Sequence, residues 1–80
     1  MTKFKEIPVN YSWLSESWQC ANVMVARQDA PINYSLLNAS WQIALVMVCR
    51  EDAPIRFDLL EDDDISWVKD ERKRRYGETY

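Results

Sequence analysis

Residues 33 to 55 read NYSLLNASWQIALVMVCREDAPI, and residues 10 to 32 read NYSWLSESWQCANVMVARQDAPI. Placed one above the other without a gap, the two stretches agree at 16 of 23 positions. Agreement at this level over so short a segment indicates an internal repeat, whose two units are these stretches. A third copy begins at Ala53 and then diverges. The sequence therefore predicts one structural unit that is used twice and is followed by a different C-terminal segment.

Two secondary structures compete for the repeated unit. Hydrophobic alternation from Ile7 to Trp13, and the run at 46–48, would suit a five-stranded meander followed by a C-terminal helix. A helix over residues 13–27 separates apolar from polar side chains more cleanly, and the meander would need tight turns without glycine. We therefore expect an all-α protein. The apolar arc contains Trp13, Leu14, Ser17, Trp18, Cys20, Ala21, Met24 and Val25, opposite Ser15, Glu16, Gln19, Asn22 and Arg27, and only Val23 does not fit this separation.

Helix boundaries are predicted from capping residues and prolines. Helices are expected to start at Ser12, at Ser35 or Asn38, and at Asp58, where Glu61 would complete a capping box. Asp-Ala-Pro should end each unit, because proline disfavours helical backbone in the residue before it. The segments after each proline, at 32–36 and 55–60, are open to two interpretations, short helices or extended connectors.

The second unit is predicted to form the central helix. Its residues Ile43 and Leu45 replace a cysteine and an asparagine of the first unit, so its helix is apolar around more of its circumference. Small residues four apart, Ser17 with Ala21 and Ser40 with Ala44, should let neighbouring helices approach closely.

The last helix is expected to begin in the acidic turn at 61–64 and to end at Gly77, with acidic residues first and basic residues last. Its apolar residues lie only in its first two turns, so the basic end is expected to project into solvent. Ion pairs of Asp70 with Arg74 and of Glu71 with Arg75 would neutralise two cations. The cations left over form a predicted basic face that could contact nucleic acid or an acidic partner, namely Lys69, Arg72 and Lys73.

Composition limits the possible functions. The 80 residues fit one helical domain, divided into an N-terminal arm at 1–9, repeat units at 10–32 and 33–55, and a C-terminal helical segment at 56–77. The chain has no histidine, which excludes histidine-based catalysis and histidine metal ligands. We expect no enzymatic activity, cofactor, metal or small-molecule substrate. Cys20 and Cys49 occupy different positions of the repeat, which favours packing over redox pairing.

The tryptophans predict a protein partner, and the hydropathy of the sequence predicts the compartment. Three short helices cannot cover four indoles, so we expect most tryptophans in the core and one or two at a protein interface. These interface candidates are Trp13, Trp18, Trp41 and Trp67. A homodimer or a complex with another protein follows as an expectation. Without an apolar export segment or membrane span, the expected location is the cytoplasm.

Part of the sequence resembles a transcription-factor family. The stretch at 32–37, a following helix, Arg-Glu-Asp-Ala at 50–53 and Arg-Phe-Asp-Leu at 56–59 are similar to the D subunit of the flagellar master transcription activator (FlhD-like proteins). That resemblance implies an all-helical dimer that binds promoter DNA together with a second subunit. Our first hypothesis is therefore a regulatory interaction protein of a transcription complex, with DNA contacted through the partner. The alternative is an accessory inhibitor or adaptor that binds and blocks another protein.

Overall fold

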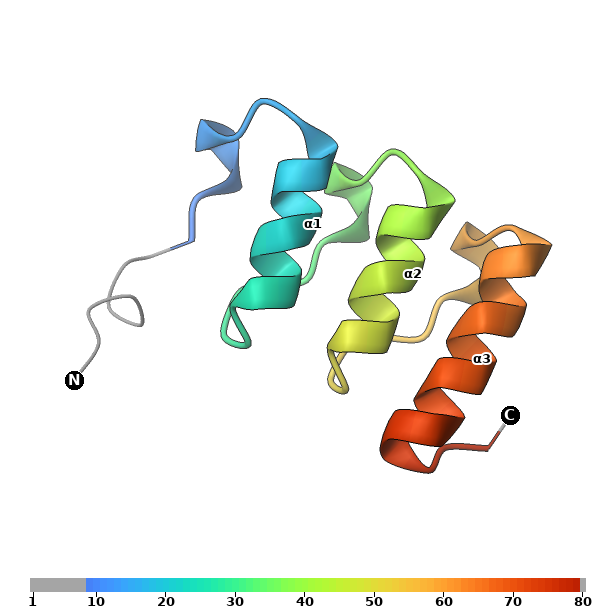
Figure 1. Ribbon diagram of the computed structural model, residues 1–80. Coiled ribbons are helices and arrows are strands. Elements are labelled where there is room, and N and C mark those ends of the chain that lie inside the picture. Colours follow the sequence, from blue (N-terminus) through green and yellow to red (C-terminus); the bar gives the residue numbers. More distant parts are fainter. Residues whose placement is uncertain (1–8, 80) are drawn as a thin grey trace.

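The computed structural model describes residues 9–79, which form three α-helices, each preceded by a short 3₁₀ helix (Figure 1). No strand occurs in this range, so the all-α prediction is confirmed and the meander is wrong. Of the predicted arm at 1–9, all but Val9 lies outside the described residues. The elements are η2 (Tyr11–Trp13), α1 (Ser17–Ala26), η3 (Tyr34–Leu36), α2 (Ser40–Cys49), η4 (Phe57–Leu59) and α3 (Asp62–Tyr76).

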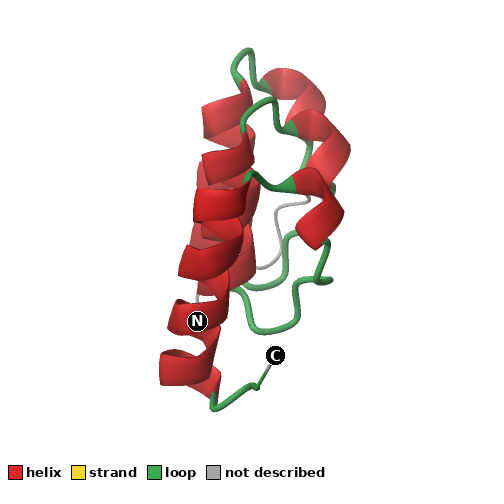
Figure 2. Cartoon of the chain, turned by 90° about the vertical axis from the view of Figure 1, so that its right-hand side faces the viewer, coloured by secondary structure: helices red, strands yellow, loops and turns green. Residues whose placement is uncertain are grey.

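The helices form two layers. The three α-helices lie side by side in one layer, and the 3₁₀ helices with their connectors form the second (Figure 2). Helix α2 contacts α1 on one side and α3 on the other. Elements η3 and α2 begin and end at the same positions of the second repeat unit as η2 and α1 do in the first. The spacing of the sequence repeat is therefore also the spacing of the structure.

Asparagine side chains fix the first two 3₁₀ helices. Asn10 Oδ1 accepts hydrogen bonds from the backbone N–H of Ser12, at 3.1 Å, and from its hydroxyl. Asn33 binds Ser35 in the same way. An asparagine that bonds to the backbone two residues ahead favours a tight turn over an α-helix. The prediction that Ser12 and Ser35 start α-helices is therefore wrong, and the segments after Pro31 and Pro54 form short 3₁₀ helices.

Glutamines set the starts of the first two α-helices. Gln19 Oε1 accepts from the backbone N–H groups of Ser15 and Glu16, and Gln42 accepts from that of Asn38. These bonds satisfy donors in front of the first helical turn, so α1 and α2 start at serines rather than at Asn38.

Of the two predicted starts of the third helix, the acidic turn at 61–64 is confirmed and Asp58 is wrong. Asp58 lies inside η4 and pairs with Arg56, so it forms no capping box with Glu61, and α3 begins at Asp62. The predicted end is confirmed, because Gly77 follows the helix in the left-handed conformation at a φ of 71°. Glycine adopts this conformation without the strain that a Cβ would add.

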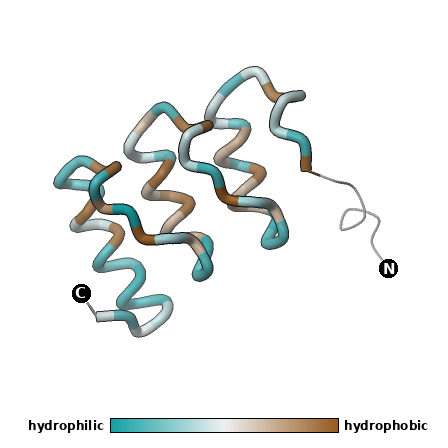
Figure 3. Tube along the Cα trace, turned by 180° about the vertical axis from the view of Figure 1, so that it is seen from behind, coloured by the Kyte–Doolittle hydropathy of each residue, from teal (hydrophilic) through white to brown (hydrophobic). Residues whose placement is uncertain are grey.

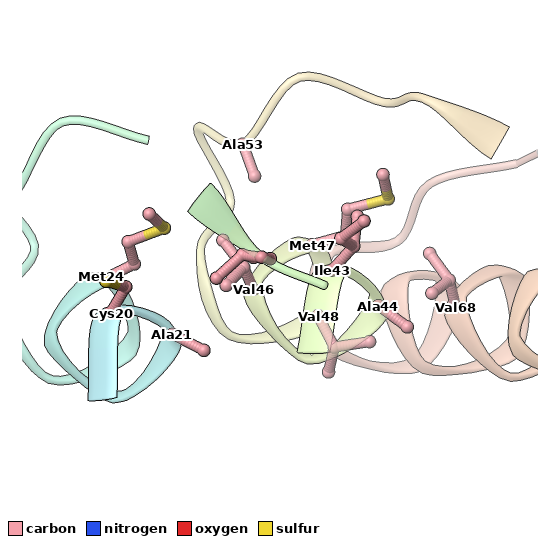
Figure 4. Packing of buried hydrophobic residues seen from close by; sticks show 11 residues of the cluster. Cys20, Ala21, Met24, Ile43, Ala44, Val46, Met47, Val48, Ala53 and Val68 are labelled. Atoms are coloured by element: carbon pink, nitrogen blue, oxygen red, sulfur yellow. The ribbon is translucent and has the colours of Figure 1, made fainter. Parts of the chain in front are cut away.

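The prediction that α2 is the most buried helix is confirmed. Six of its residues are buried, against three in α1 and two in α3. In Figure 4, Ala21 points from α1 toward α2, and Ala44 points from α2 toward α3, so small side chains occupy both helix contacts as expected. In Figure 3, which colours each residue by its hydropathy, hydrophobic residues recur along α1 and α2, whereas the second half of α3 is hydrophilic. Among the described residues, no helix has the length and apolar character that a membrane span requires.

Candidate protein-binding surface

Arg50 holds α2 against the end of α1. Its Nη1 donates to the carbonyl oxygens of Met24, Arg27 and Ala30 at 2.8, 3.0 and 3.1 Å, while Nε and Nη2 donate to Asp52. The last carbonyls of a helix have no partner within the helix, and a guanidinium supplies donors in a fixed plane. This residue therefore caps the preceding helix and fixes the position of α2 beside it.

Arg72 does the same for the end of α2. Its Nη1 donates to the carbonyls of Met47 and Arg50, its Nη2 donates to that of Glu51, and Glu78 accepts from Nε at 2.8 Å. The side chain is only 3% exposed. The prediction that Arg72 belongs to a solvated basic face is wrong, because the side chain turns back under the neighbouring helix.

The other two predicted cations do not lie beside Arg72 on an open face. Lys69 Nζ lies 5.3 Å from the centre of the Phe57 ring, and Lys73 is exposed. The expected pair of Glu71 with Arg75 is present at 3.2 Å, but Arg74 pairs with Glu71 rather than with Asp70. At this end of α3, Arg74 and Arg75 thus share the carboxylate of Glu71, and Lys73 is exposed beside them.

All four tryptophans are exposed, so the prediction that most of them form the core is wrong. The buried cluster instead consists of small and medium side chains, mainly alanine, valine and methionine. Helices that touch through alanines lie too close together for indoles to fit between them. The exposed fractions are 77% for Trp13, 49% for Trp18, 56% for Trp41 and 40% for Trp67.

Three of these indoles belong to one side of the helical layer. Trp41 and Leu45 are one turn apart on α2, and Trp18 holds in α1 the position that Trp41 holds in α2. Arg72 binds the end of α2 as Arg50 binds the end of α1, so these two arginines hold equivalent positions in α3 and α2. With the two helices aligned on them, Trp67 holds the position of Leu45. We call this set the tryptophan face, consisting of Trp18, Trp41, Leu45 and Trp67.

The fourth indole is separate from this face. Trp13 is the last residue of η2, in the layer of 3₁₀ helices, and it lines a pocket at the N-terminal end of the array. The four predicted interface residues therefore divide into a group of three and one that lies elsewhere.

Carboxylates surround Trp67. The four residues one helical turn away from it are all acidic, namely Asp63, Asp64, Asp70 and Glu71. Asp64 accepts a hydrogen bond from the Ser40 hydroxyl at 2.5 Å, and Glu71 binds two arginines, whereas Asp63 and Asp70 are exposed. The tryptophan face thus carries an acidic rim on α3, which would repel nucleic acid.

The Tyr34 side chain supports the fold through a hydrogen bond to the connector that follows α2. Burial raises the pKa of Tyr34 to about 12, and its hydroxyl donates to the Pro54 carbonyl at 2.7 Å.

Cys20 and Cys49 are not joined by a disulfide. Within residues 9–79, no three acidic or cysteine side chains come together in a way that could hold a metal ion. A groove of about 500 Å³ lies between η3 and η4, where Leu37, Ile43 and Leu59 contribute to its wall.

No family model, curated protein or solved structure matches the chain. The resemblance to the flagellar activator subunit therefore stays a prediction.

Sequence reasoning missed the role of the arginines. Val-x-x-x-Arg occurs at 23–27, 46–50 and 68–72, and in the second and third cases its arginine caps the preceding helix. This recurring spacing is the sequence signal for the capping arginines, because it continues into α3, where the other residues of the repeat are absent.

Proposed function

We propose that this chain is a non-catalytic protein-binding module, an adaptor or inhibitor that contacts its partner through the tryptophan face. The observation that carries the proposal is the exposure of three indoles on one side of a layer of three helices. Contiguous exposed apolar side chains typically mark interaction sites, and tryptophan is among the residues that contribute most to binding energy.

The helical layer supports this use because it is rigid where the indoles are attached. Each α-helix is fixed to the next by an alanine contact and by an arginine that binds the preceding helix end. Indoles held on such a scaffold lose little conformational freedom on binding, which favours affinity. The acidic residues beside Trp67 favour a partner surface that carries lysine or arginine, since cations are attracted both to carboxylates and to the indole ring.

Direct binding to nucleic acid is less well supported. The predicted basic face loses Arg72 to the interior, and the exposed Arg74 and Arg75 are paired with Glu71. A regulatory role in a transcription complex remains compatible with our proposal if the partner, rather than this chain, contacts DNA. A second copy of the chain is one candidate partner, and the mass in solution tests it.

The test compares the protein with its Trp41→Ala and Trp67→Ala variants in partner capture and in sedimentation. We expect each variant to lose at least about 2 kcal/mol of binding to the captured partner or to a second copy. Lys73→Gln serves as the control, because Lys73 is exposed and lies outside the tryptophan face. A partner held equally by all four proteins would overturn the proposal, as would a monomer that binds no protein.

A parallel titration with a labelled DNA duplex at low salt tests the alternative. The double variant carries both Lys69→Gln and Lys73→Gln. If the unaltered chain binds DNA and this double variant binds it more weakly, the transcription hypothesis becomes the better account.

A further inference from the structure

A regular stripe of exposed residues runs along one side of α3. Asp63, Trp67 and Asp70 stand at i, i+4 and i+7, a spacing that places them in line on a helix. All three are exposed. A rise of about 1.5 Å per residue puts the two aspartates about 10 Å apart along the helix axis. Trp67 therefore lies midway between two negative charges, and we call these three residues the α3 stripe.

The two aspartates of the stripe are not neutralised by the rest of the described chain. Their acidic neighbours have partners, since Asp64 binds the Ser40 hydroxyl and Glu71 binds two arginines. The side chains of Asp63 and Asp70, in contrast, take part in no hydrogen bond or ion pair within residues 9–79. An indole ring also attracts cations through the negative potential of its face, so all three groups of the stripe favour a positively charged ligand.

The apolar surface beside the stripe continues from α3 onto α2. Trp41 and Leu45 lie one helical turn apart on α2, and α2 packs directly against α3. A ligand that reaches both aspartates and Trp67 therefore also meets apolar side chains of the neighbouring helix. Anchors that repeat at i, i+4 and i+7 are typical of surfaces that bind an amphipathic helix.

A second copy of the chain does not supply a matching helix. The helices α1 and α2 contain no charged residue. In α3, Arg74 and Arg75 already pair with Glu71. Within residues 9–79, no two lysine or arginine residues stand seven apart in the sequence, which is the spacing of the two aspartates. The occupant that fits the stripe is therefore a helix of a different protein.

We propose that the α2–α3 part of the tryptophan face binds a cationic amphipathic helix of another protein. The partner helix lies along α3. Two of its lysine or arginine residues, seven positions apart, pair with Asp63 and Asp70, and a leucine or similar side chain between them packs on Trp67. This inference rests on the function proposed above and adds the chemistry of the partner.

The probe is a fluorescently labelled, alanine-based helical peptide with lysines seven residues apart and leucines midway between them. A control peptide carries glutamates in place of the lysines. We expect saturable binding of the lysine peptide to the full chain at low salt, measured by fluorescence anisotropy, and weaker binding as the salt concentration rises. Absence of saturable binding would overturn the proposal, as would equal binding of the glutamate peptide.

Two double variants of equal net charge locate the site. Asp63→Asn with Asp70→Asn removes the charges of the stripe and should weaken binding of the lysine peptide about tenfold. The matched control, Asp62→Asn with Glu51→Gln, removes two exposed carboxylates outside the stripe and should change the affinity less than about twofold. Circular dichroism checks that both variants stay helical. Equal weakening by the two variants would show that net charge alone attracts the peptide, contrary to the proposal.

Partner capture separates this inference from the function on which it rests. If Trp67→Ala loses the captured partner while Asp63→Asn with Asp70→Asn holds it unchanged, the tryptophan face is an interface for a partner that is not cationic, and only the present inference fails. If Trp67→Ala also holds the partner unchanged, both fail. A dimer that excludes the lysine peptide and that Trp67→Ala dissociates would assign the face to a second copy and contradict the inference.

Discussion

Helices α2 and α3 attach to their preceding helices in the same way, although their compositions are almost opposite. The ten residues of α2 include no charged side chain, whereas ten of the fifteen in α3 are charged. What they share is a buried valine on the side of the preceding helix and an arginine four residues later. The difference teaches that attachment in this array needs two positions, and that the rest of a helix is free to vary with its exposure.

The largest expected effect comes from removing an arginine of this kind. Arg50→Ala would remove the guanidinium donor from the carbonyls of Met24, Arg27 and Ala30 and would open space between α1 and α2. We expect the free energy of unfolding to fall by about 3 kcal/mol. Urea denaturation followed by circular dichroism measures it. A loss below about 1 kcal/mol would show that α2 stays attached through apolar packing alone.

A smaller effect should distinguish the interior of the array from its end. Val46→Ala removes two methyl groups from a fully buried position and should cost about 2 kcal/mol, whereas Val23→Ala at a partly buried position should cost less than about 1 kcal/mol. Thermal unfolding of the two variants gives the comparison. Equal losses would mean that Val23 is packed as tightly as Val46, contrary to its partial burial.

Tyr34 should make the protein sensitive to alkali. Its pKa in the folded chain is about 12, above the ordinary value of 10.0, because burial disfavours the phenolate. The unfolded chain therefore loses this proton first, so the stabilising contribution is complete below pH 10 and is lost as the pH rises to about 12. Tyr34→Phe should cost about 1 kcal/mol at neutral pH through the lost bond to Pro54, and it should flatten this alkaline decline. A decline of unchanged steepness would assign the effect to other tyrosines.

Much of the fold follows from local sequence signals. The helical class, the central position of α2, and the acidic start and glycine end of α3 are all predictable, because they depend on periodicity and capping. The starts of α1 and α2 are not, since Asn10 and Gln19 act through side-chain bonds that compete with the ordinary serine cap. A pattern of residue types does not reveal which of these bonds forms.

The site is harder to predict than the fold. Trp18 and Trp41 fall on an apolar arc of the sequence, yet they are exposed, because alanine contacts bring the helices too close for indoles. Arg72 is predicted to be exposed and is instead buried, since its partners are backbone carbonyls beyond its own helix. No composition or charge pattern reveals such partners. Both errors concern contacts between units, where the sequence of one helix does not report the shape of its neighbour.

The most direct measurement compares two arginines of α3 that lie close together in the sequence. Arg72 is buried and caps α2, whereas Arg74 is exposed and pairs with Glu71 on its own helix. We expect Arg72→Gln to lower the free energy of unfolding by about 3 kcal/mol and Arg74→Gln to lower it by less than about 0.5 kcal/mol. Losses that are equal within error would contradict the claim that a capping arginine attaches each helix to the one before it.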